Sequence, residues 1–598
     1  GRADGELGRA LQSSNQLTRA YALAERAMLH RARHDNVKAA ADLRAADALY
    51  ATLGLDFDRI DTQAALSQAL LALNDLPAAS SAADSAIAME QRIRVKSANP
   101  EWRARFLAAS YSPYEARIAV DLAAARKGDQ RAAWRAFRTA ETVRARSLAD
   151  QLAASTRRTD ATQDPDGDAL RARLTAEQMR LEVRVLRQDV DDDATKELRR
   201  SIQETRALID ANALKLANGS RRTVADPALA ESLETTMSAL PPDTAVLAFF
   251  VGDDAGHAWL LSRAGLQHRQ LTGRAELQRL ADAAVAAQRA IPAAARQPGQ
   301  RAIARALLGS LLDGWHGTRL LLIPDGPLNA VPFAALPVND SGSEILLDRY
   351  VIGYAPSLSL AMRTPSRPAA HSSRVVVISD PVYARDDSRL RIATNGDQSS
   401  FRGGIPAPPT NFTRLPYSGV EARAVMRVFS TSQVTELSGF EATPARVLKL
   451  HSEDMAILHF ATHALARRDS PDQSALYLSE FAADGTPLMD SRLTADQIAR
   501  SGLHADLVVL SGCATGDGGA VRGEGVLGLT YAFLANGSRT VVASLWSIQD
   551  ASTARLMKEF YDSYRTTGRA ADAMRSAQLR MRDGAAWASF VVRANEFP

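Results

Sequence analysis

Short apolar strands alternate with helical segments along the second half of the chain. From Asp243 onward, runs of continuous apolar residues are separated by segments whose apolar residues recur at helical spacing. Such strands, unlike those that alternate apolar and polar residues, are typical of a mostly parallel sheet covered by helices on both faces. We therefore predict an α/β domain, with strands at 245–251, 258–261, 319–323, 348–356, 375–378, 434–437, 455–463, 507–510 and 540–546.

The first half is helical. From about Gly5 to Ala154 it is rich in Ala, Leu, Arg and Glu, with apolar residues three and four positions apart. Three similar segments, 34–40, 74–79 and 128–133, each place a turn with Asp before an alanine-rich helix. Their offsets of 40 and 54 residues resemble degenerate tetratricopeptide repeats with extended helices. We favour a solenoid whose concave face binds a protein partner over a plain helical bundle that braces the rest.

A polar linker with Pro and Gly, 160–168, separates these repeats from two charged helical segments. The segments, 169–188 and 195–217, are joined by an acidic run at 189–193, which predicts an antiparallel helical hairpin. Five residues that include four Asp invite a metal interpretation. We interpret them instead as a solvated turn and helix N-cap.

Polar groups follow three of the predicted strands. Asp380, His463 and Cys513 each lie at a carboxyl end, the edge at which open α/β sheets bind ligands. A thiol is mostly protonated at neutral pH, so a nucleophilic cysteine needs a base such as histidine close by. Small residues flank both His463 and Cys513, which would admit a peptide backbone and leave amide N–H groups for an oxyanion. A lone cysteine is usually a buried hydrophobe, but the paired strand ends favour a catalytic function.

Competing sites are less well supported. His459 and His463 are four residues apart, yet Phe460 stands where the zinc-peptidase motif has Glu, and the segment is a predicted strand. His459 is therefore predicted to be a hydrogen-bonded core residue. The run 523–525 (GEG) could bind an anion, although Glu524 as a helix-start residue is the simpler explanation. Neither the G-x-S-x-G nor the P-loop motif occurs.

The composition excludes several kinds of site and gives no sign of nucleic-acid binding or a membrane span. The single cysteine among 598 residues excludes an internal disulfide framework and a cysteine-based zinc site. A formal charge of +4 on a chain of this length does not indicate nucleic-acid binding. No apolar run approaches the eighteen or so residues of a membrane span, so we expect a cytoplasmic protein. Targeting is left open because the chain starts at Gly1 rather than Met.

Six segments occur in an order that identifies a family. They are 323–333 (IPDGPLNAVPF), 457–463 (ILHFATH), 508–516 (VVLSGCATG), 523–525 (GEG), 532–537 (AFLANG) and 541–546 (VVASLW). Together they resemble the CHAT domain, a family of caspase-like cysteine peptidases related to separases and often preceded by tetratricopeptide repeats. The resemblance covers about Asp243 to the end of the chain, and the helical first half fits the usual partner domain.

The resemblance implies four regions and a catalytic dyad. The regions are a repeat domain (1–160), a linker with a helical hairpin (161–240), a non-catalytic first part of the CHAT region (241–370) and a caspase-like catalytic part (371–598). By position, Cys513 is the nucleophile and His463 the general base, whose ring is oriented by a backbone carbonyl. The backbone N–H groups of Cys513 and Ala464 would form the oxyanion hole. No cofactor or metal is implied.

Several positions depart from the family pattern. Ala464 replaces the glycine that usually follows the histidine, and Gly512 replaces the alanine that usually precedes the cysteine. Gln549 stands for the first of two Asp residues after the 540–546 strand, and Asp583-Gly584-Ala585-Ala586 stands for a His-Pro-Tyr-Tyr run before Trp587. None of these changes removes a catalytic side chain.

Substrate binding is predicted on four segments. Asp380, Ser511, Trp546 and Asp550 would line the S1 pocket, and the strand ending at Trp546 would pair with an extended substrate. An acidic pocket would favour Arg or Lys at the cleavage site, unless either Asp caps a helix or pairs with an arginine. The long Pro- and Gly-rich stretch 381–418 is a candidate lid or cleavable segment.

The function predicted from the resemblance is a cysteine endopeptidase that cleaves a specific protein. Gasdermin-like pore formers and other bacterial antiviral defence proteins are the substrate class that the family suggests. An activator or regulator would bind the repeat-like face. The alternative is a non-catalytic scaffold of repeats and CHAT domain that only binds partners.

Overall fold

The computed structural model describes most of the chain. The described residues are 2–94, 106–107, 110–144, 148, 165–186, 192–218, 232–289, 297–339, 342–362, 374–390, 412–430, 433–450, 455–467, 471–488, 490–512, 520–521, 525–526, 528–582, 584, 586–594 and 597. Cys513, Glu524 and most of the 381–418 stretch lie outside the described residues. All structural statements below concern the described part.

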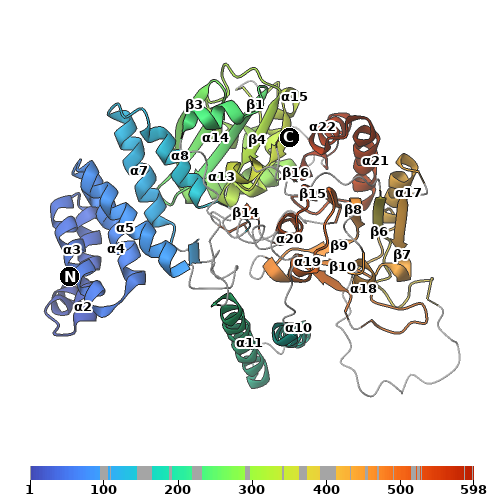
Figure 1. Cartoon of the computed structure of the whole chain (residues 1–598), viewed down its shortest axis with the longest axis horizontal. Helices are drawn as coiled ribbons and strands as arrows, with labels where there is room; N and C mark the ends of the chain where they lie inside the picture. Colours follow the sequence, from blue (N-terminus) through green and yellow to red (C-terminus); the bar gives the residue numbers. More distant parts are fainter. Residues whose placement is uncertain are drawn as a thin grey trace.

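A single eleven-stranded sheet runs through the second half of the molecule (Figure 1). Its order is β3-β2-β1-β4-β5-β16-β15-β12-β8-β6-β7. Neighbours are parallel except at β3/β2, β2/β1 and β16/β15. The strands are β1 (Thr244–Val251), β2 (Ala255–Ser262), β3 (Gly265–Thr272), β4 (Arg319–Ile323), β5 (Val351–Tyr354), β6 (Arg374–Ser379), β7 (Val434–Ser438), β8 (Met455–Ala461), β12 (Leu507–Leu510), β15 (Thr540–Ser544) and β16 (Phe590–Ala594). The predicted mostly parallel sheet is confirmed.

Helices cover both faces of this sheet. Successive residues of one strand enter different cores: Val375 and Val377 pack in one cluster, Val376 and Ile378 in another. The strands are therefore continuously apolar because each face is buried. The covering helices are α13 (Arg274–Arg289), α14 (Gln297–Leu307), α17 (Ser418–Val428), α19 (Ala495–Ser501), α20 (Leu529–Ala535), α21 (Asp550–Thr567) and α22 (Ala570–Arg580).

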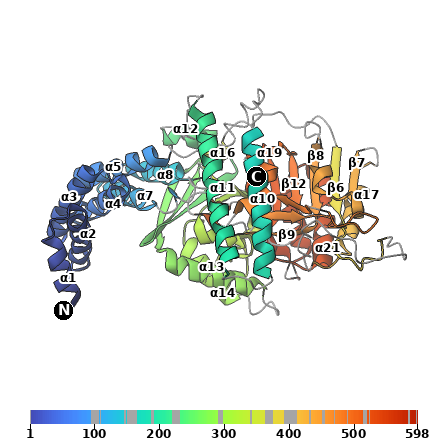
Figure 2. The ribbon, with the colours of Figure 1, turned by 90° about the horizontal axis from the view of Figure 1, so that it is seen from below.

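The first half is a curved row of antiparallel helices (Figures 1 and 2). The helices are α1 (Arg2–Leu11), α2 (Gln16–Ala32), α3 (Asn36–Leu53), α4 (Asp56–Ala72), α5 (Leu76–Arg94), α7 (Ser112–Arg126) and α8 (Ala132–Thr142). The three predicted turns share one backbone shape. His34, Asn74 and Gly128 have left-handed φ values of 59°, 66° and 96°, and in each case the next residue is an Asp whose side chain accepts a backbone N–H. The predicted helical repeats are confirmed.

The predicted helical hairpin is also present. α10 (Pro165–Leu186) and α11 (Asp193–Asn218) lie side by side in Figure 2. Asp192 caps α11 by accepting the N–H of Thr195 at 2.8 Å, as predicted for the acidic turn; the rest of that turn, 189–191, lies outside the described residues. Within the described ranges, no cluster of three His, Cys, Asp or Glu residues could hold a metal ion. No described helix is long and apolar enough to cross a membrane.

The last repeat helices are part of the sheet's core. Tyr111, at the start of α7, stacks on Phe250 of β1 with ring centroids 4.7 Å apart, and Phe137 of α8 meets the ring of Trp259. These four side chains belong to one buried cluster with residues of β4 and with α16 (Leu358–Ala361). The repeats are therefore joined to the sheet by a shared apolar core.

Candidate active site

Three strand ends meet at one edge of the sheet. In the parallel register of β6, β8 and β12, Phe460 lies opposite both Ile378 and Leu510. The chain therefore leaves β6 at Asp380, β8 at Thr462 and His463, and β12 at Ser511 and Gly512, all at the same level. This is the arrangement expected for a ligand site in an open α/β sheet.

Gly512, the residue before Cys513, packs closely against the segment that carries His463. A Cβ at position 512 would come within 2.5 Å of the Thr462 carbonyl oxygen and 3.2 Å of the Ala464 Cβ. The Gly512 carbonyl accepts a hydrogen bond from the Ser544 hydroxyl at 2.8 Å. Cys513 itself lies outside the described residues, but its preceding residue is held beside the histidine segment.

Two departures from the family pattern are explained by this contact. Ala464 places a methyl group where the family usually has glycine, and Gly512 omits one on the facing segment. Even without the Ala464 methyl, the Thr462 carbonyl would still oppose a side chain at 512, because that oxygen belongs to the backbone. Glycine at 512 is therefore a packing requirement of this chain.

We expect Gly512→Ala to lower the rate of peptide cleavage about 100-fold, because relieving the collision moves the turn that carries Cys513 by a sizeable fraction of an ångström. The measurement is kcat/KM on one cleaved peptide. Gly8→Ala is the matched control, since a Cβ at that exposed helical position meets nothing within 4 Å. If both variants cleave at the wild-type rate, the close contact does not position the site.

His463 is half-buried in an aromatic enclosure at the start of β9 (His463–Leu465). Phe412 stacks on its ring with centroids 4.5 Å apart and planes 16° apart, and the Tyr383 ring lies at 5.0 Å. The backbone N–H of His463 donates to the Tyr383 hydroxyl at 3.2 Å. Stacking on the ring face and the backbone hydrogen bond together hold His463 in place.

The Thr413 carbonyl fixes the protonation pattern of this ring. It lies 2.8 Å from Nε2 of His463. A carbonyl only accepts, so Nε2 carries the proton and Nδ1 of the neutral ring is the acceptor. Burial lowers the pKa of His463, and the bond to Thr413 opposes part of that shift. The imidazole is therefore neutral at pH 7 and able to take up a proton.

His459 has a structural role, as predicted. It is fully buried on β8, with Nδ1 2.9 Å from the Tyr561 hydroxyl and Nε2 2.8 Å from a carboxylate oxygen of Glu421. These contacts tie β8 to α17 and α21. The zinc interpretation has no further ligand among the described residues.

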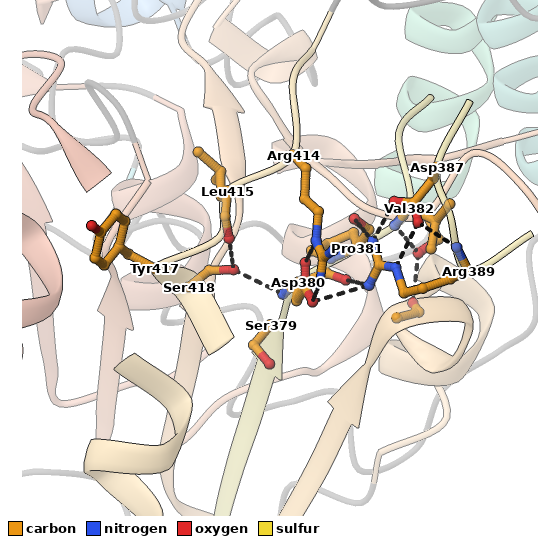
Figure 3. Close-up of polar contacts among 12 residues, drawn as sticks. Ser379, Asp380, Pro381, Val382, Asp387, Arg389, Arg414, Leu415, Tyr417 and Ser418 are labelled. Carbon is orange, nitrogen blue, oxygen red and sulfur yellow. Dashed lines mark hydrogen bonds and ion pairs between the residues drawn. The ribbon is translucent and has the colours of Figure 1, made fainter. Parts of the chain in front are cut away.

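Asp380 is held by two arginines (Figure 3). Its carboxylate accepts from Arg414 Nε at 2.8 Å and Nη2 at 2.6 Å, and Arg389 Nη1 lies 3.0 Å from Oδ2. Its backbone has a left-handed φ of 45°, unusual for a residue other than glycine. Of the two alternatives weighed for Asp380, the structure shows pairing with arginine.

The other residues predicted to line the S1 pocket each contact a different part of the structure. Ser511 Oγ donates to the Phe460 carbonyl at 3.0 Å, and Trp546 is buried in a core cluster with Leu545. Asp550 Oδ2 accepts the N–H of Tyr417 at 2.7 Å, and burial raises the pKa of Asp550. Ala464 lies opposite Leu476 in the small sheet of β9, β10 (Ala475–Tyr477) and β11 (Arg492–Thr494).

Four site residues were not identified from the sequence: Tyr383, Phe412, Thr413 and Arg414. All four belong to the 381–418 stretch, which its length and its Pro- and Gly-rich composition marked as a candidate lid or cleavable segment. A carbonyl acceptor has no side-chain signal, and the pairing of Arg414 depends on where that stretch passes over the strand ends.

A family comparison matches this architecture. The family model described as "CHAT domain" matches residues 247–594, more than half of the chain. This chain belongs to the CHAT domain family. The match begins within β1 and ends at the last residue of β16, so it takes in every strand of the large sheet, β1 in part. The family is one of caspase-like peptidases.

Two relatives with the same name match part of this CHAT protein. Tetratricopeptide repeat protein 28 of Homo sapiens is 27% identical over 309 residues, 46% of this chain and 12% of the relative. The Mus musculus protein of the same name is 26% identical over 261 residues, 41% of this chain and 10% of the relative. This chain thus spans about a tenth of the length of these relatives.

Two crystal structures of the Saccharomyces cerevisiae separase–securin complex align with nearly the whole CHAT protein. Their TM-scores are 0.35 and 0.40, with 11% and 9% identity. The alignments cover 98% and 99% of this chain, and 41% and 48% of those chains. Scores below 0.5 carry no inference about the chemistry of this chain.

Proposed function

We propose that this CHAT protein is a cysteine endopeptidase with Cys513 as nucleophile and His463 as general base. The observation that carries the proposal is the state of His463: a neutral, half-buried imidazole with Nε2–H bound to the Thr413 carbonyl and Nδ1 left as the acceptor. The tight packing of Gly512 against Thr462 and Ala464 brings the residue before Cys513 beside it. A base of this kind is what a thiol nucleophile requires.

The chemistry follows from these groups. His463 Nδ1 takes the thiol proton, and the Cys513 thiolate attacks the carbonyl carbon of the scissile peptide bond. The backbone N–H groups of Cys513 and Ala464 would bind the oxyanion that forms. The intermediate collapses to a thioester as His463 returns the proton to the leaving amine. Water, deprotonated by His463, then hydrolyses the thioester and restores the thiol.

The substrate in this proposal is a protein. An extended substrate segment would pair with the backbone that ends at Trp546, with Ser511, Trp546 and Asp550 as the proposed substrate-binding residues. Asp380, the fourth residue predicted for this pocket, has both carboxylate oxygens bonded to Arg414. The repeat helices are proposed to bind a regulator or activator. A gasdermin-like pore former, or another bacterial defence protein, is the narrower substrate class suggested by the family.

The pH dependence of thiol alkylation tests the dyad without a known substrate. Cys513 is the only cysteine, so iodoacetamide reports on this thiol alone. We expect the wild-type thiol to react with an apparent pKa below about 7.5, since a nearby imidazole stabilises the thiolate, and His463→Gln to return it to about 8.5.

His316→Gln is the matched control, because His316 is exposed and lies outside the site. It should leave the alkylation profile unchanged. A wild-type alkylation profile centred near pH 8.5 and unchanged by His463→Gln would contradict the dyad. The non-catalytic scaffold would then be the better-supported function.

A further inference from the structure

The segment 412–418, which leads into α17, contacts the site through aromatic stacking and hydrogen bonds. At its start, Phe412 stacks on His463 and meets the ring of Tyr477 edge-on at 4.7 Å. At its end, the N–H of Tyr417 donates to Asp550. The Thr413 carbonyl that contacts His463 lies between these anchors, and Arg414 is the next residue along the chain.

Arg414 makes a charged, two-bond contact between this segment and the end of β6. Its guanidinium meets the Asp380 carboxylate through two parallel hydrogen bonds, at 2.8 and 2.6 Å. A bidentate pair of this kind fixes direction as well as distance. Because the Thr413 carbonyl belongs to the peptide group that joins Thr413 to Arg414, anchoring Arg414 restricts where that oxygen points.

Asp380 is itself rigidly placed. Arg389 binds its carboxylate and its carbonyl oxygen, at 3.0 and 2.9 Å, and is in turn paired with Asp387 (Figure 3). The N–H of Asp380 donates to the Ser418 hydroxyl at 3.1 Å, which connects the end of β6 to the first residue of α17. A non-glycine residue held at a φ of 45° is strained, and such strain concentrates at functional positions.

The charges of this cluster cancel. Two carboxylates, Asp380 and Asp387, face two guanidinium groups, Arg389 and Arg414, so the formal sum is zero. Both oxygens of Asp380 are occupied. The contacts therefore favour a structural anchor at Asp380 over an acidic pocket waiting for a basic substrate side chain.

We propose that Asp380 and Arg414 are positioning residues that hold the Thr413 carbonyl on His463 Nε2. The path runs from the end of β6 through the Asp380 carboxylate and the Arg414 guanidinium to the peptide oxygen and the imidazole. Neither side chain touches the reacting atoms. The inference deepens the proposed peptidase function and rests on it, because it assigns the residues that orient the general base.

The experiment compares Arg414→Ala, Arg414→Lys and Asp380→Asn with the wild-type chain. Kinetics are measured on peptides that differ only in the residue before the cleaved bond: Arg, Lys, Leu or Asp. We expect kcat to fall about 10- to 100-fold by the same factor on every peptide, with KM unchanged, because the general base is misoriented while substrate contacts remain. Lysine should recover only part of the rate, since it cannot form the bidentate pair.

Arg427→Ala is the matched control. Arg427 is an exposed arginine of α17 whose hydrogen bond goes to the Arg423 carbonyl of its own helix. It should cleave every peptide at the wild-type rate. Thermal unfolding of each variant separates a misoriented base from a chain that fails to fold.

A second readout follows the imidazole directly. Nitrogen NMR of His463 reports the tautomer and pKa of the ring in the intact chain, with or without activity. In Arg414→Ala and Asp380→Asn we expect a mixed tautomer population and a lower His463 pKa than in the wild type, because the bond to Thr413 that raises the pKa is weakened.

The remaining outcomes either contradict the proposed anchor or leave its test to the NMR readout. Loss confined to Arg and Lys peptides would assign Asp380 to a basic-residue pocket, and a rate increase would make the segment an inhibitor; both overturn the inference. An unchanged His463 tautomer and pKa also overturns it. If the wild type and Cys513→Ala are equally inert because the proposed activator is missing, the NMR readout alone decides whether the anchor exists.

Discussion

Replacing Cys513 by alanine is expected to lower peptide cleavage at least about 10⁴-fold, to the background of the assay. The thiolate forms the covalent bond in the proposed mechanism, so its removal leaves only binding and oxyanion stabilisation. The measurement is digestion of a peptide library by the purified chain, followed by mass spectrometry of the cleaved bonds. The wild-type digest also gives the residue preference at the cleavage site.

The control for this variant is its ability to bind the same partner. Cys513→Ala should retain the wild-type thermal midpoint and capture the native substrate uncleaved, because the change removes one sulfur atom. Persistent cleavage of the same bonds at the wild-type rate would refute the peptidase function. Together with unchanged partner binding, that result would support the scaffold alternative.

The strand ends could be predicted from the sequence because their signals are local. β8 and β12 are continuous apolar runs, and the small polar turns after them mark where each strand stops. Because β8 and β12 are parallel neighbours, His463 lies near Gly512, the residue before Cys513. The prediction needed only strand direction and adjacency, and the register confirms both.

β16 was not predicted as a strand, although it completes the sheet between β5 and β15. Its sequence, Phe590–Ala594, carries a buried arginine, which weakens the apolar signal. Arg593 lies with its guanidinium carbon 5.6 Å from the centre of the Tyr354 ring, a contact between residues far apart in sequence. Tertiary pairing of this kind determines the strand and is invisible to local pattern.

The anchors of His463 could not be predicted for a related reason. Asp380 was recognised as a strand-end residue, and its pairing with an arginine was one of the alternatives considered. Which arginine, and what the pairing does to the neighbouring Thr413 carbonyl, depends on the return path of the 381–418 stretch. Sequence alone therefore predicted the dyad and left the orientation of His463 open.

Glu141 joins the repeat helices to the sheet, and its substitution is the largest stability change that we expect. The side chain is buried at the end of α8, where one carboxylate oxygen pairs with the buried guanidinium of Arg144. The other accepts the N–H groups of Leu358 and Ser359 at the start of α16, at 2.8 and 3.3 Å. Arg144 also donates to the Phe249 carbonyl of β1.

Glu141→Ala should therefore destabilise the chain by about 3–5 kcal/mol, because it leaves the Arg144 cation buried without its carboxylate and removes the acceptor from the α16 N–H groups. Urea denaturation measures the loss, and hydrogen exchange at Leu358 and Ser359 locates it. Glu204→Ala is the matched control: that exposed glutamate faces Arg200 at 4.0 Å, so its removal should change stability by less than about 1 kcal/mol.

A double variant separates the ion pair from simple loss of packing. Glu141→Gln combined with Arg144→Met removes both charges and keeps side chains of similar size, so it should be more stable than Glu141→Ala alone, since an isolated buried charge costs more than an absent pair. If the double variant is as unstable as the single one, the loss comes from packing, because the glutamine oxygen can still accept the α16 N–H groups and no charge is left buried. If Glu141→Ala matches Glu204→Ala, the carboxylate does not hold the repeats on the sheet.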